Sequence, residues 1–413
     1  MSSATDTDRS PTTAHARSGS RPWLTVFGIL FVCAWSGNQF SPMLLLYKDV
    51  DHYSSGMVTL FLGIYVVGLA PSFVLAGALS DYFGRRPPMV CALIAGLLAS
   101  VFLAIGDLGW AAILIGRLFA GVAVGTAMVV GTSWLKEVSR PPFDARADVG
   151  LGARRASVAF TTGSALGALV AGSIAQWGPW PEVLPYAIHM VVTVPFLALL
   201  RRTPETVVPS PERLGMRSHL RFGSVRHRRF LRVVVVCGPW LFAACALAYG
   251  YLPVLLADKT GGLGLAYATG VSVVALLCGA LIQPVAKRID SVSSARGTVV
   301  SLMLITAGVV VMIASVGLGS PWIGVVANVI FGCGFGIGLV SGLMEVQRLA
   351  PPEDLARLTG VFYAIAYLGF VLPTILAATA SWFSVLALLG AVVVLLVIST
   401  LFVVGSSRKH LPA

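Results

Sequence analysis

Long runs of apolar residues follow one another along almost the whole chain and are separated by short polar connections. A helix needs about 20 apolar residues to cross a bilayer. Twelve runs come close to or exceed that length: 23–46, 55–78, 88–106, 109–135, 155–176, 182–200, 231–256, 262–286, 297–318, 322–344, 356–379 and 383–405. A membrane β-barrel would show alternating segments of about 10 residues instead. The pattern therefore predicts an all-α membrane protein with twelve transmembrane helices.

Composition agrees with this prediction. Of the 413 residues, 57% are apolar and 11% are charged, whereas soluble domains carry about 25% charged residues. The net charge of +12 is not displayed on a polar domain, as nucleic-acid binding would require. These numbers exclude a cytosolic enzyme, a disordered regulator and a nucleic-acid-binding protein. The six cysteines lie inside apolar runs without a CxxC pair, so we expect neither disulfides nor a metal site.

The basic residues predict the orientation of the chain. If the N-terminus is cytoplasmic, the outer connections hold only Lys48 and Lys259, and Arg117 lies inside the fourth run. The remaining 26 of the 29 lysines and arginines then fall on the inner side. Cytoplasmic loops carry the excess of Lys and Arg in membrane proteins. We therefore expect a multi-pass protein of the cell membrane with both termini in the cytoplasm.

The longest connection, residues 201–230, divides the runs into six and six. It carries Arg201, Arg202, Arg213, Arg217, Arg221, Arg226, Arg228 and Arg229. We interpret it as a basic cytoplasmic linker that fixes topology and rests on anionic lipid head groups. A docking site for an anionic partner is the alternative.

Two short sequence segments occur in similar form in both halves of the chain, which indicates an internal duplication. Gly77-Ala78-Leu79 returns as Gly279-Ala280-Leu281, and Glu137-Val138-Ser139-Arg140 returns as Glu345-Val346-Gln347-Arg348, at offsets of 202 and 208 residues. Transporters commonly arise from such repeats, with a site between the halves. We expect two six-helix bundles related by a pseudo-two-fold repeat. The expected parts are a disordered cytoplasmic tail (1–22), an N-terminal bundle (23–200), the linker (201–230), a C-terminal bundle (231–405) and a cytoplasmic tail (406–413).

One connection carries a specific motif. Between the second and third runs the chain reads Gly77-Ala-Leu-Ser-Asp81-Tyr-Phe-Gly84-Arg85-Arg86-Pro87. Gly84 permits a tight turn, Asp81 can meet the positive N-terminus of a neighbouring helix, and the arginines can pair with a carboxylate, for which Glu137 is the obvious partner. The stretch resembles the signature loop of the major facilitator superfamily, G-x-L-x-D-x-x-G-R-R, with departures at Tyr82 and Pro87.

That resemblance implies two bundles around a central cavity that opens to alternate sides. It also implies a latch that holds the outward-open state, for which the candidates are Gly77, Asp81, Gly84, Arg85, Arg86 and Glu137. The copy in the second half is degenerate, because Gln283-Pro284 occupies the acidic region and leaves Lys287 and Arg288. We therefore expect an asymmetric latch.

Two further stretches resemble motifs of proton-coupled and antiporting family members. In Arg117-Leu-Phe-Ala-Gly121-Val-Ala-Val-Gly125 an arginine lies inside a helix, where burial costs several kcal/mol unless the charge is paired or hydrated. Arg117 either faces the cavity, tuning a proton site or an anionic substrate, or snorkels and bonds backbone carbonyls. Residues 163–172 resemble a degenerate form of the glycine motif of antiporters that lacks the Gly-Pro dipeptide. The alternative interpretation is that these small residues serve ordinary helix packing.

The proton carrier is left open by the sequence, because no acidic residue lies in the middle third of a run. The candidates are Arg117, His189, Glu345 and Asp258. His189 is the mid-membrane imidazole, and its unperturbed pKa suits proton exchange. A packed, hydrogen-bonded role in a peripheral helix is the alternative for this residue.

By the resemblance, the first, fourth, seventh and tenth helices line the cavity, with the second, fifth, eighth and eleventh at its sides. The candidate lining residues are Asn38, Gln39, Tyr65, Arg117, Trp240, Tyr249, Asn328, Tyr363 and Tyr367. Such a mostly apolar, aromatic wall suits moderately hydrophobic molecules.

We therefore expect a secondary active transporter that moves a small, moderately hydrophobic molecule by alternating access, most like the twelve-span proton-coupled drug exporters. Its partners would be that small molecule and membrane lipids, and we expect a monomer. We expect no enzymatic activity, no cofactor and no metal, with the proton gradient as the energy source. Uptake or facilitated diffusion of a small metabolite is one alternative, and a non-transporting membrane receptor or scaffold is another.

Overall fold

The computed structural model describes residues 21–49, 52–144, 151–207, 224–350 and 355–409. Within these ranges twelve helical segments are long and apolar enough to cross a membrane. They are Pro22–Lys48, Ser55–Phe83, Arg86–Ala104, Trp110–Val138, Leu151–Trp177, Leu184–Arg202, Phe230–Lys259, Gly264–Leu281, Arg296–Leu318, Pro321–Leu349, Leu358–Thr379 and Val385–Ser406. Each overlaps one predicted run, so the prediction of an all-helical chain with twelve spans is confirmed.

The first six spans are built from eight α-helices. These are α1 (Pro22–Asn38), α2 (Phe40–Asp49), α3 (Ser55–Phe83), α4 (Arg86–Ala104), α5 (Trp110–Thr126), α6 (Thr132–Val138), α7 (Leu151–Trp177) and α8 (Leu184–Arg202). The helices α1 and α2 together make the first span. A π-helical stretch, Ala127–Gly131, joins α5 to α6 in the fourth span.

The second half of the described chain contains nine α-helices. These are α10 (Val235–Cys245), α11 (Leu252–Leu256), α12 (Gly264–Leu281), α13 (Gln283–Ile289), α14 (Arg296–Leu318), α15 (Pro321–Leu349), α16 (Leu355–Tyr367), α17 (Leu372–Thr379) and α18 (Val385–Ser406). The helix α13 follows the eighth span, and the others belong to the last six spans. The π-helical stretches Phe230–Val234 and Ala246–Tyr251 complete the seventh span, and the 3-10 turn Leu368–Val371 joins α16 to α17.

Several helices extend beyond the predicted apolar runs. Because α3 continues to Phe83, Gly77 and Asp81 lie in its last turns, and the connection shrinks to Gly84 and Arg85. The predicted eighth run is instead interrupted after Leu281, because Pro284 in the first turn of α13 cannot donate a backbone hydrogen bond. Residues 1–20 of the expected tail, 208–223 of the expected linker and 410–413 of the second tail lie outside the described residues.

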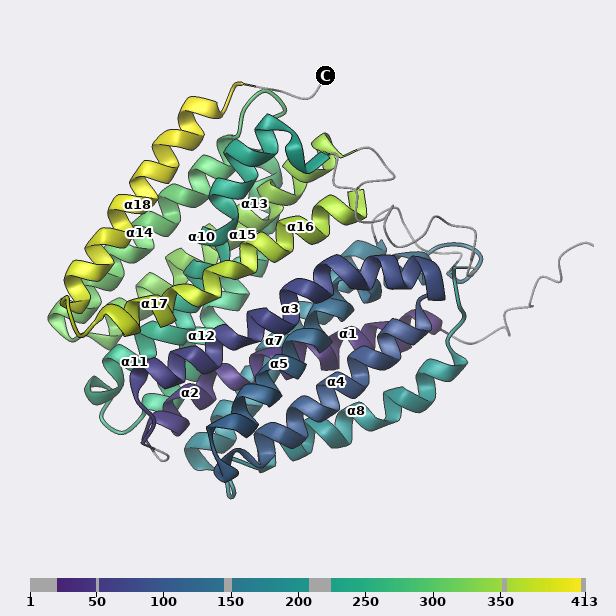
Figure 1. The fold of residues 1–413 in the computed structure, drawn as a ribbon, viewed down its shortest axis with the longest axis horizontal. Coiled ribbons are helices and arrows are strands. Elements are labelled where there is room, and N and C mark those ends of the chain that lie inside the picture. The colour runs from purple at the N-terminus through teal and green to yellow at the C-terminus, as the bar shows by residue number, and fades with distance from the viewer. Residues whose placement is uncertain (1–20, 50–51, 145–150, 208–223, 351–354, 410–413) are drawn as a thin grey trace, which may run out of the picture.

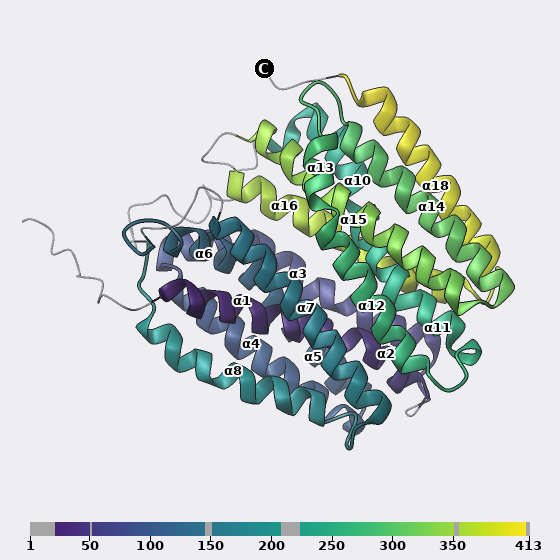
Figure 2. The same ribbon diagram turned by 180° about the vertical axis from the view of Figure 1, so that it is seen from behind.

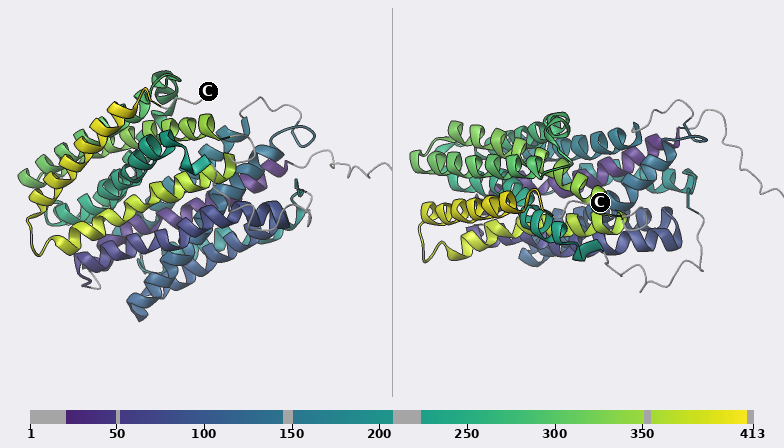
Figure 3. Two further views of the ribbon diagram at one scale, coloured as in Figure 1. Left: turned by 45° about the horizontal axis from the view of Figure 1, so that its top comes forward. Right: turned by 90° about the horizontal axis from the view of Figure 1, so that it is seen from above.

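The helices form two bundles, α1–α8 and α10–α18, which lie side by side (Figures 1 and 2). Figure 3 shows the same two bundles from two further directions. The face at which α3, α6, α8, α13 and α15 end is called the basic face, and the other is the opposite face. Of the described lysines and arginines, Lys48 and Lys259 lie at the opposite face, Arg117 lies within a span, and the rest lie at or near the basic face.

Both described ends of the chain lie at the basic face. Near the first end, the guanidinium carbon of Arg155 lies 3.8 Å from the centroid of the Trp23 ring. Near the last, Arg229 donates hydrogen bonds to the carbonyls of Ser407 and Lys409 at 3.0 and 3.3 Å. An even number of spans requires this arrangement.

Candidate functional site

A cavity of about 540 Å³ lies between the two bundles. Toward the basic face its lining continues to Lys136, Ala153, Gln347 and Leu355, which lie at or near the ends of their helices. Toward the opposite face it stops within the spans, at Gly37, Ser41, Leu62 and Arg117. The cavity therefore opens to the basic face and is blind toward the opposite face.

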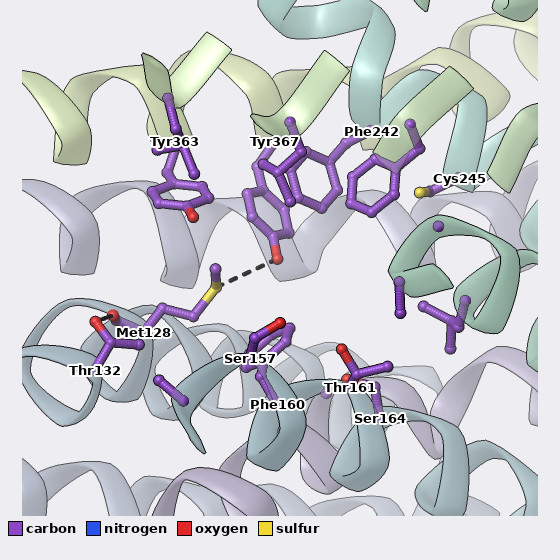
Figure 4. A pocket seen from close by; sticks show the side chains of 18 of the residues that line it. Met128, Thr132, Ser157, Phe160, Thr161, Ser164, Phe242, Cys245, Tyr363 and Tyr367 are labelled. Atoms are coloured by element: carbon purple, nitrogen blue, oxygen red, sulfur yellow. Dashed lines mark hydrogen bonds between the residues drawn. The ribbon is translucent and has the colours of Figure 1, made fainter. Parts of the chain in front are cut away.

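The two bundles contribute chemically different walls. The hydroxyl wall comes from α6 and α7 of the first bundle and consists of Thr132, Ser133, Ser157, Thr161 and Ser164. The aromatic wall comes from the second bundle and consists of Phe242, Phe335, Tyr363, Tyr367 and Phe370. Figure 4 shows members of the two walls facing each other across the cavity. Met128 and Phe160 of the first bundle also line the cavity, so that wall combines hydroxyl and apolar groups whereas the wall across from it is mainly aromatic.

The rings of the aromatic wall pack against one another and against a neighbouring ring of the first bundle. The rings of Phe242 and Tyr367 stack with centroids 3.6 Å apart, and Tyr363 stacks on Phe73 at 5.2 Å. The Tyr367 hydroxyl donates a hydrogen bond across the cavity to Met128 Sδ at 3.5 Å (Figure 4). Rings that pack on one another in this way form an aromatic wall whose arrangement is set before a molecule binds.

Arg117 forms the blind end of the cavity and is 2% exposed. Its Nε donates to the Phe61 carbonyl at 3.1 Å and its Nη1 to the Gly37 carbonyl at 3.2 Å. The guanidinium carbon lies 4.4 and 4.5 Å from the ring centroids of Phe40 and Tyr65. Arg117 and Lys136 are the cationic residues among the described lining, which contains no Asp, Glu or His.

The small residues that follow Arg117 explain its position. A Cβ atom on Gly121 would lie 2.2 Å from the Tyr65 carbonyl oxygen, and one on Gly125 would lie 2.8 Å from that of Leu69. These glycines therefore allow α5 to approach the backbone of α3 closely. The approach brings Arg117 within hydrogen-bonding distance of the Phe61 carbonyl.

Contacts between the bundles close the opposite face. Gln176 donates through Nε2 to the Gly262 carbonyl at 3.3 Å and accepts from the Ala266 N–H at 3.0 Å. Lys48 donates to the Val254 carbonyl at 3.3 Å, and Thr374 donates to that of Thr59 at 2.8 Å. The bundles thus meet at the end where the cavity is blind.

Residues of the predicted latch contact one another within the first bundle. The Arg85 guanidinium donates to both Glu137 oxygens, at 3.1 and 2.7 Å, and to Asp81 at 3.2 Å and Ser80 at 2.8 Å. Burial lowers the pKa of Arg85, but the hydrogen bonds and charges of Glu137 and Asp81 outweigh it, so the pKa lies above its ordinary value. A Cβ on Gly77 would make only an ordinary contact, 3.5 Å from Val129.

Glu205 completes this cluster and was not among the residues predicted for it. Its carboxylate accepts from the N–H groups of Arg85 and Arg86 at 2.8 and 3.0 Å and so caps the start of α4. Arg86 Nε donates to the Thr203 carbonyl at 2.7 Å. Gly84 has a φ of 91°, and a Cβ there would lie 2.8 Å from the Glu205 carboxylate. No spacing in the sequence links residue 205 to this turn.

The second bundle has a different ion-pair cluster at its basic-face end. Arg229 donates to both oxygens of Glu345, at 2.6 and 2.7 Å, with both side chains buried. Arg348 pairs with Asp290. Glu137 and Glu345 therefore each bind an arginine, but one arginine precedes α4 and the other precedes α10. Lys287 and Arg288, the remnant of the degenerate copy, are exposed.

Six of the nine residues predicted to line the cavity do so: Asn38, Tyr65, Arg117, Tyr249, Tyr363 and Tyr367. Gln39, Trp240 and Asn328 lie elsewhere. Gln39 donates to Ser100 on α4 at 3.3 Å, Trp240 to Ser399 on α18 at 3.0 Å, and Asn328 to the Gly324 carbonyl of its own helix at 2.9 Å. A step of one residue turns a helix by about 100°, which separates Gln39 from Asn38.

The proposed proton carriers are dispersed. His189 is buried inside the first bundle, where Nδ1 contacts Ser100 Oγ at 2.7 Å and Nε2 contacts the Val32 carbonyl at 3.0 Å. This arrangement favours the packed, hydrogen-bonded interpretation. Glu345 is held in its ion pair at the basic face, and Asp258 is exposed at the opposite face. Among these candidates, Arg117 alone contributes to the described lining.

The glycine motif of the fifth span serves helix packing. A Cβ on Gly163 would lie 2.2 Å from the Phe31 carbonyl oxygen, and one on Gly167 would lie 2.8 Å from that of Trp35. These glycines therefore bring α7 against α1. Ser157, Thr161 and Ser164 occupy positions i, i+4 and i+7 of the same helix, so they lie on one face. This polar pattern could have predicted that α7 lines the cavity, although these residues were not among the predicted ones.

The sequence profile described as the Major Facilitator Superfamily matches residues 25–374. The chain belongs to this family. It is therefore a membrane transporter of small molecules and not an enzyme. No curated protein sequence matches the chain.

Solved transporter structures share the fold at low identity. A POT family transporter in complex with 5-aminolevulinic acid is 13% identical, with a TM-score of 0.76 over 94% of this chain and 96% of that one. A D-xylose–proton symporter is 16% identical, with a TM-score of 0.65 over 94% and 97% of the two chains. A mutant of the nucleoside transporter NupG is 11% identical, with a TM-score of 0.69 over 92% and 98%. At these identities the likeness shows the fold, and it does not single out drug exporters.

Proposed function

We propose that this major facilitator superfamily transporter exports a small, moderately hydrophobic molecule from the cytoplasm, with the proton gradient as the energy source. The observation that carries the proposal is an amphipathic cavity open to the basic face and blind toward the opposite face. The excess of Lys and Arg at the basic face supports placing that face, the linker and both termini in the cytoplasm. The cavity then receives substrate from the cytoplasmic side.

The contacts that close the opposite face support alternating access. They are hydrogen bonds between a side chain of one bundle and a backbone N–H or carbonyl group of the other. Asp81 is 42% exposed and is bound within its own bundle. The resemblance implies that Asp81 belongs to a latch whose contacts change when the basic face closes. Closure of one face would then accompany opening of the other.

A second mode, facilitated diffusion or uptake of a small metabolite, is favoured by one specific observation. The described lining of the cavity contains neither a carboxylate nor an imidazole. A proton carried during transport would then bind outside the cavity or on the substrate itself. If no proton binds at either place, the substrate would cross the membrane down its own concentration gradient.

Flux measurements in proteoliposomes separate these modes. Purified protein is reconstituted, and uptake of a panel of aromatic compounds of charge −1, 0 and +1 is followed with and without an imposed pH gradient. Export coupled to protons predicts accumulation of at least one compound that requires the gradient and is abolished by a protonophore. Equilibration at the same rate in the absence of a gradient would contradict proton coupling and support facilitated diffusion.

A further inference from the structure

We infer that the transported molecule is an organic anion with an aromatic or otherwise apolar body, and that its negative group binds Arg117 at the blind end of the cavity. This inference names the substrate class of the proposed function and rests on the cavity being the transport site. The sequence leaves three roles open for Arg117: tuning a proton site, binding an anionic substrate, or snorkelling and bonding backbone carbonyls. The side chain does bond two backbone carbonyls, and the inference adds the anionic substrate to those contacts.

The charge of Arg117 lacks a counter-charge within the described part of the chain. Its hydrogen-bond acceptors are two neutral carbonyls, and its other neighbours are two ring faces. No described carboxylate forms an ion pair with it, and its Nη2 donates no hydrogen bond to a described residue. By contrast, the buried Arg229 binds a carboxylate through two nitrogens. A buried guanidinium favours an anion, and the cavity is the route by which one can reach it.

The path to Arg117 is also positive. Lys136 lines the cavity near the basic face, and it follows Arg117 along the same span at a distance of about 28 Å, taking 1.5 Å per residue. The described lining between them carries no acidic side chain that would repel an anion. Cavities lined by one sign of charge attract the opposite sign, so an anion is favoured at the entrance as well as at the blind end.

The remaining lining suits the apolar body of such a molecule. Phe242, Tyr363 and Tyr367 form a fixed aromatic surface on one side, and the hydroxyl wall lies across from them (Figure 4). Toward the blind end Ser41 and Tyr65 add neutral hydroxyl groups to the lining. A cation would have to approach the Arg117 guanidinium without a compensating carboxylate. Lipophilic cations are therefore disfavoured as substrates.

A charge series on one ring system tests this inference. We would measure binding of 2-naphthoate, 2-naphthamide and 2-naphthylmethylammonium to the purified protein in lipid nanodiscs by calorimetry at neutral pH. Because a hydrogen bond to a charged partner is worth more than a neutral one, we expect the anion to bind at least about tenfold more tightly than the amide, and the ammonium most weakly. Equal affinities for anion and amide, tighter binding of the ammonium, or no binding of 2-naphthoate would each overturn the inference.

Variants then assign the effect to Arg117. Arg117→Gln should reduce the affinity for 2-naphthoate to that of 2-naphthamide while the amide changes less than about threefold. Arg117→Lys should keep the preference for the anion. Lys259→Gln, which removes a cation at the opposite face, is the control and should leave the ranking unchanged. An Arg117→Gln protein that keeps the full preference for the anion would refute the assignment to this residue.

The design separates this inference from the proposed function. The charge ranking is an equilibrium measurement on wild-type protein without a gradient, so it does not depend on proton coupling or on the direction of transport, and it holds even if Arg117→Gln does not fold. A preserved ranking with gradient-independent flux would contradict proton-coupled export alone. A reversed ranking with gradient-driven flux of another compound would contradict the anion assignment alone.

Discussion

The two most deeply buried arginines of the described residues, Arg117 and Arg229, are stabilised in different ways. Arg229 is neutralised by Glu345 through two hydrogen bonds and also binds backbone carbonyls near the end of α18. Arg117 has carbonyls and rings but no described carboxylate. Removing one member of a buried ion pair leaves an uncompensated charge, which costs about 3–5 kcal/mol. The Arg229 cluster therefore stabilises the fold, whereas we propose that Arg117 binds substrate.

Glu345→Gln should lower the free energy of unfolding by several kcal/mol, because the charge of Arg229 stays buried without its partner. Thermal unfolding of the purified protein in detergent measures this as a lower midpoint. Glu137→Gln is the matched comparison, since Glu137 is partly exposed and its loss should cost less.

The double variant Arg229→Met with Glu345→Leu removes both charges and should recover part of the lost midpoint. A single variant as stable as the wild type, or a double variant no better than the single, would contradict a stabilising role for this pair.

Single residues of the site were predictable only where a local pattern exists. The pairing of Arg85 with Glu137 followed from two charged groups at helix ends on one face, and the structure forms it. The contacts of Glu205 and Arg229 were not predicted, because these residues come from the two ends of the linker and reach partners 120 and 116 residues away. Contacts between residues that only the tertiary fold brings together produce no recognisable spacing or periodicity in the sequence.

At the scale of elements, the apolar pattern located all twelve spans but not their ends. Hydropathy reports the length of chain inside hydrocarbon, whereas a helix continues until its backbone hydrogen bonds are satisfied otherwise. For that reason α3 extends past the predicted run to Phe83. The π-helical stretches in the fourth and seventh spans were not predicted either, since they leave the apolar pattern unchanged.

The contact between α7 and α12 yields a prediction about the closed end. A Cβ on Gly172 would lie 1.7 Å from Thr269 Oγ1 and 2.8 Å from Thr269 Cβ. Gly172→Ala should therefore separate the two bundles at the opposite face and shift the protein toward the state that is open there. We expect a cysteine at Thr359, on the cavity lining, to react more slowly with a water-soluble maleimide in this background.

Gly270→Ala is the control on the adjacent residue of α12, because nothing lies within 4 Å of a Cβ at that position. It should leave the labelling rate unchanged. If Gly172→Ala leaves the rate unchanged as well, or raises it, the contact does not control the closed end.

At the scale of the whole molecule, function depends on how the two bundles are placed around the cavity. The bundles present a hydroxyl wall and an aromatic wall, with a positive charge at each end of the path between them. The sequence predicted two bundles and an aromatic lining. It could not predict which face is open, because alternating states use the same helices and the same apolar faces in different packings.

Distances between the bundles test alternating access most directly. With native cysteines replaced by alanine, spin labels at Arg140 and Gln347 report the basic face, and labels at Trp177 and Leu263 report the opposite face, all four being exposed. Each pair is measured in nanodiscs at acidic and alkaline pH, with and without 2-naphthoate. The account predicts that the first distance shortens in the same conditions in which the second lengthens. Distances that stay fixed in every condition, or that rise and fall together, would contradict it.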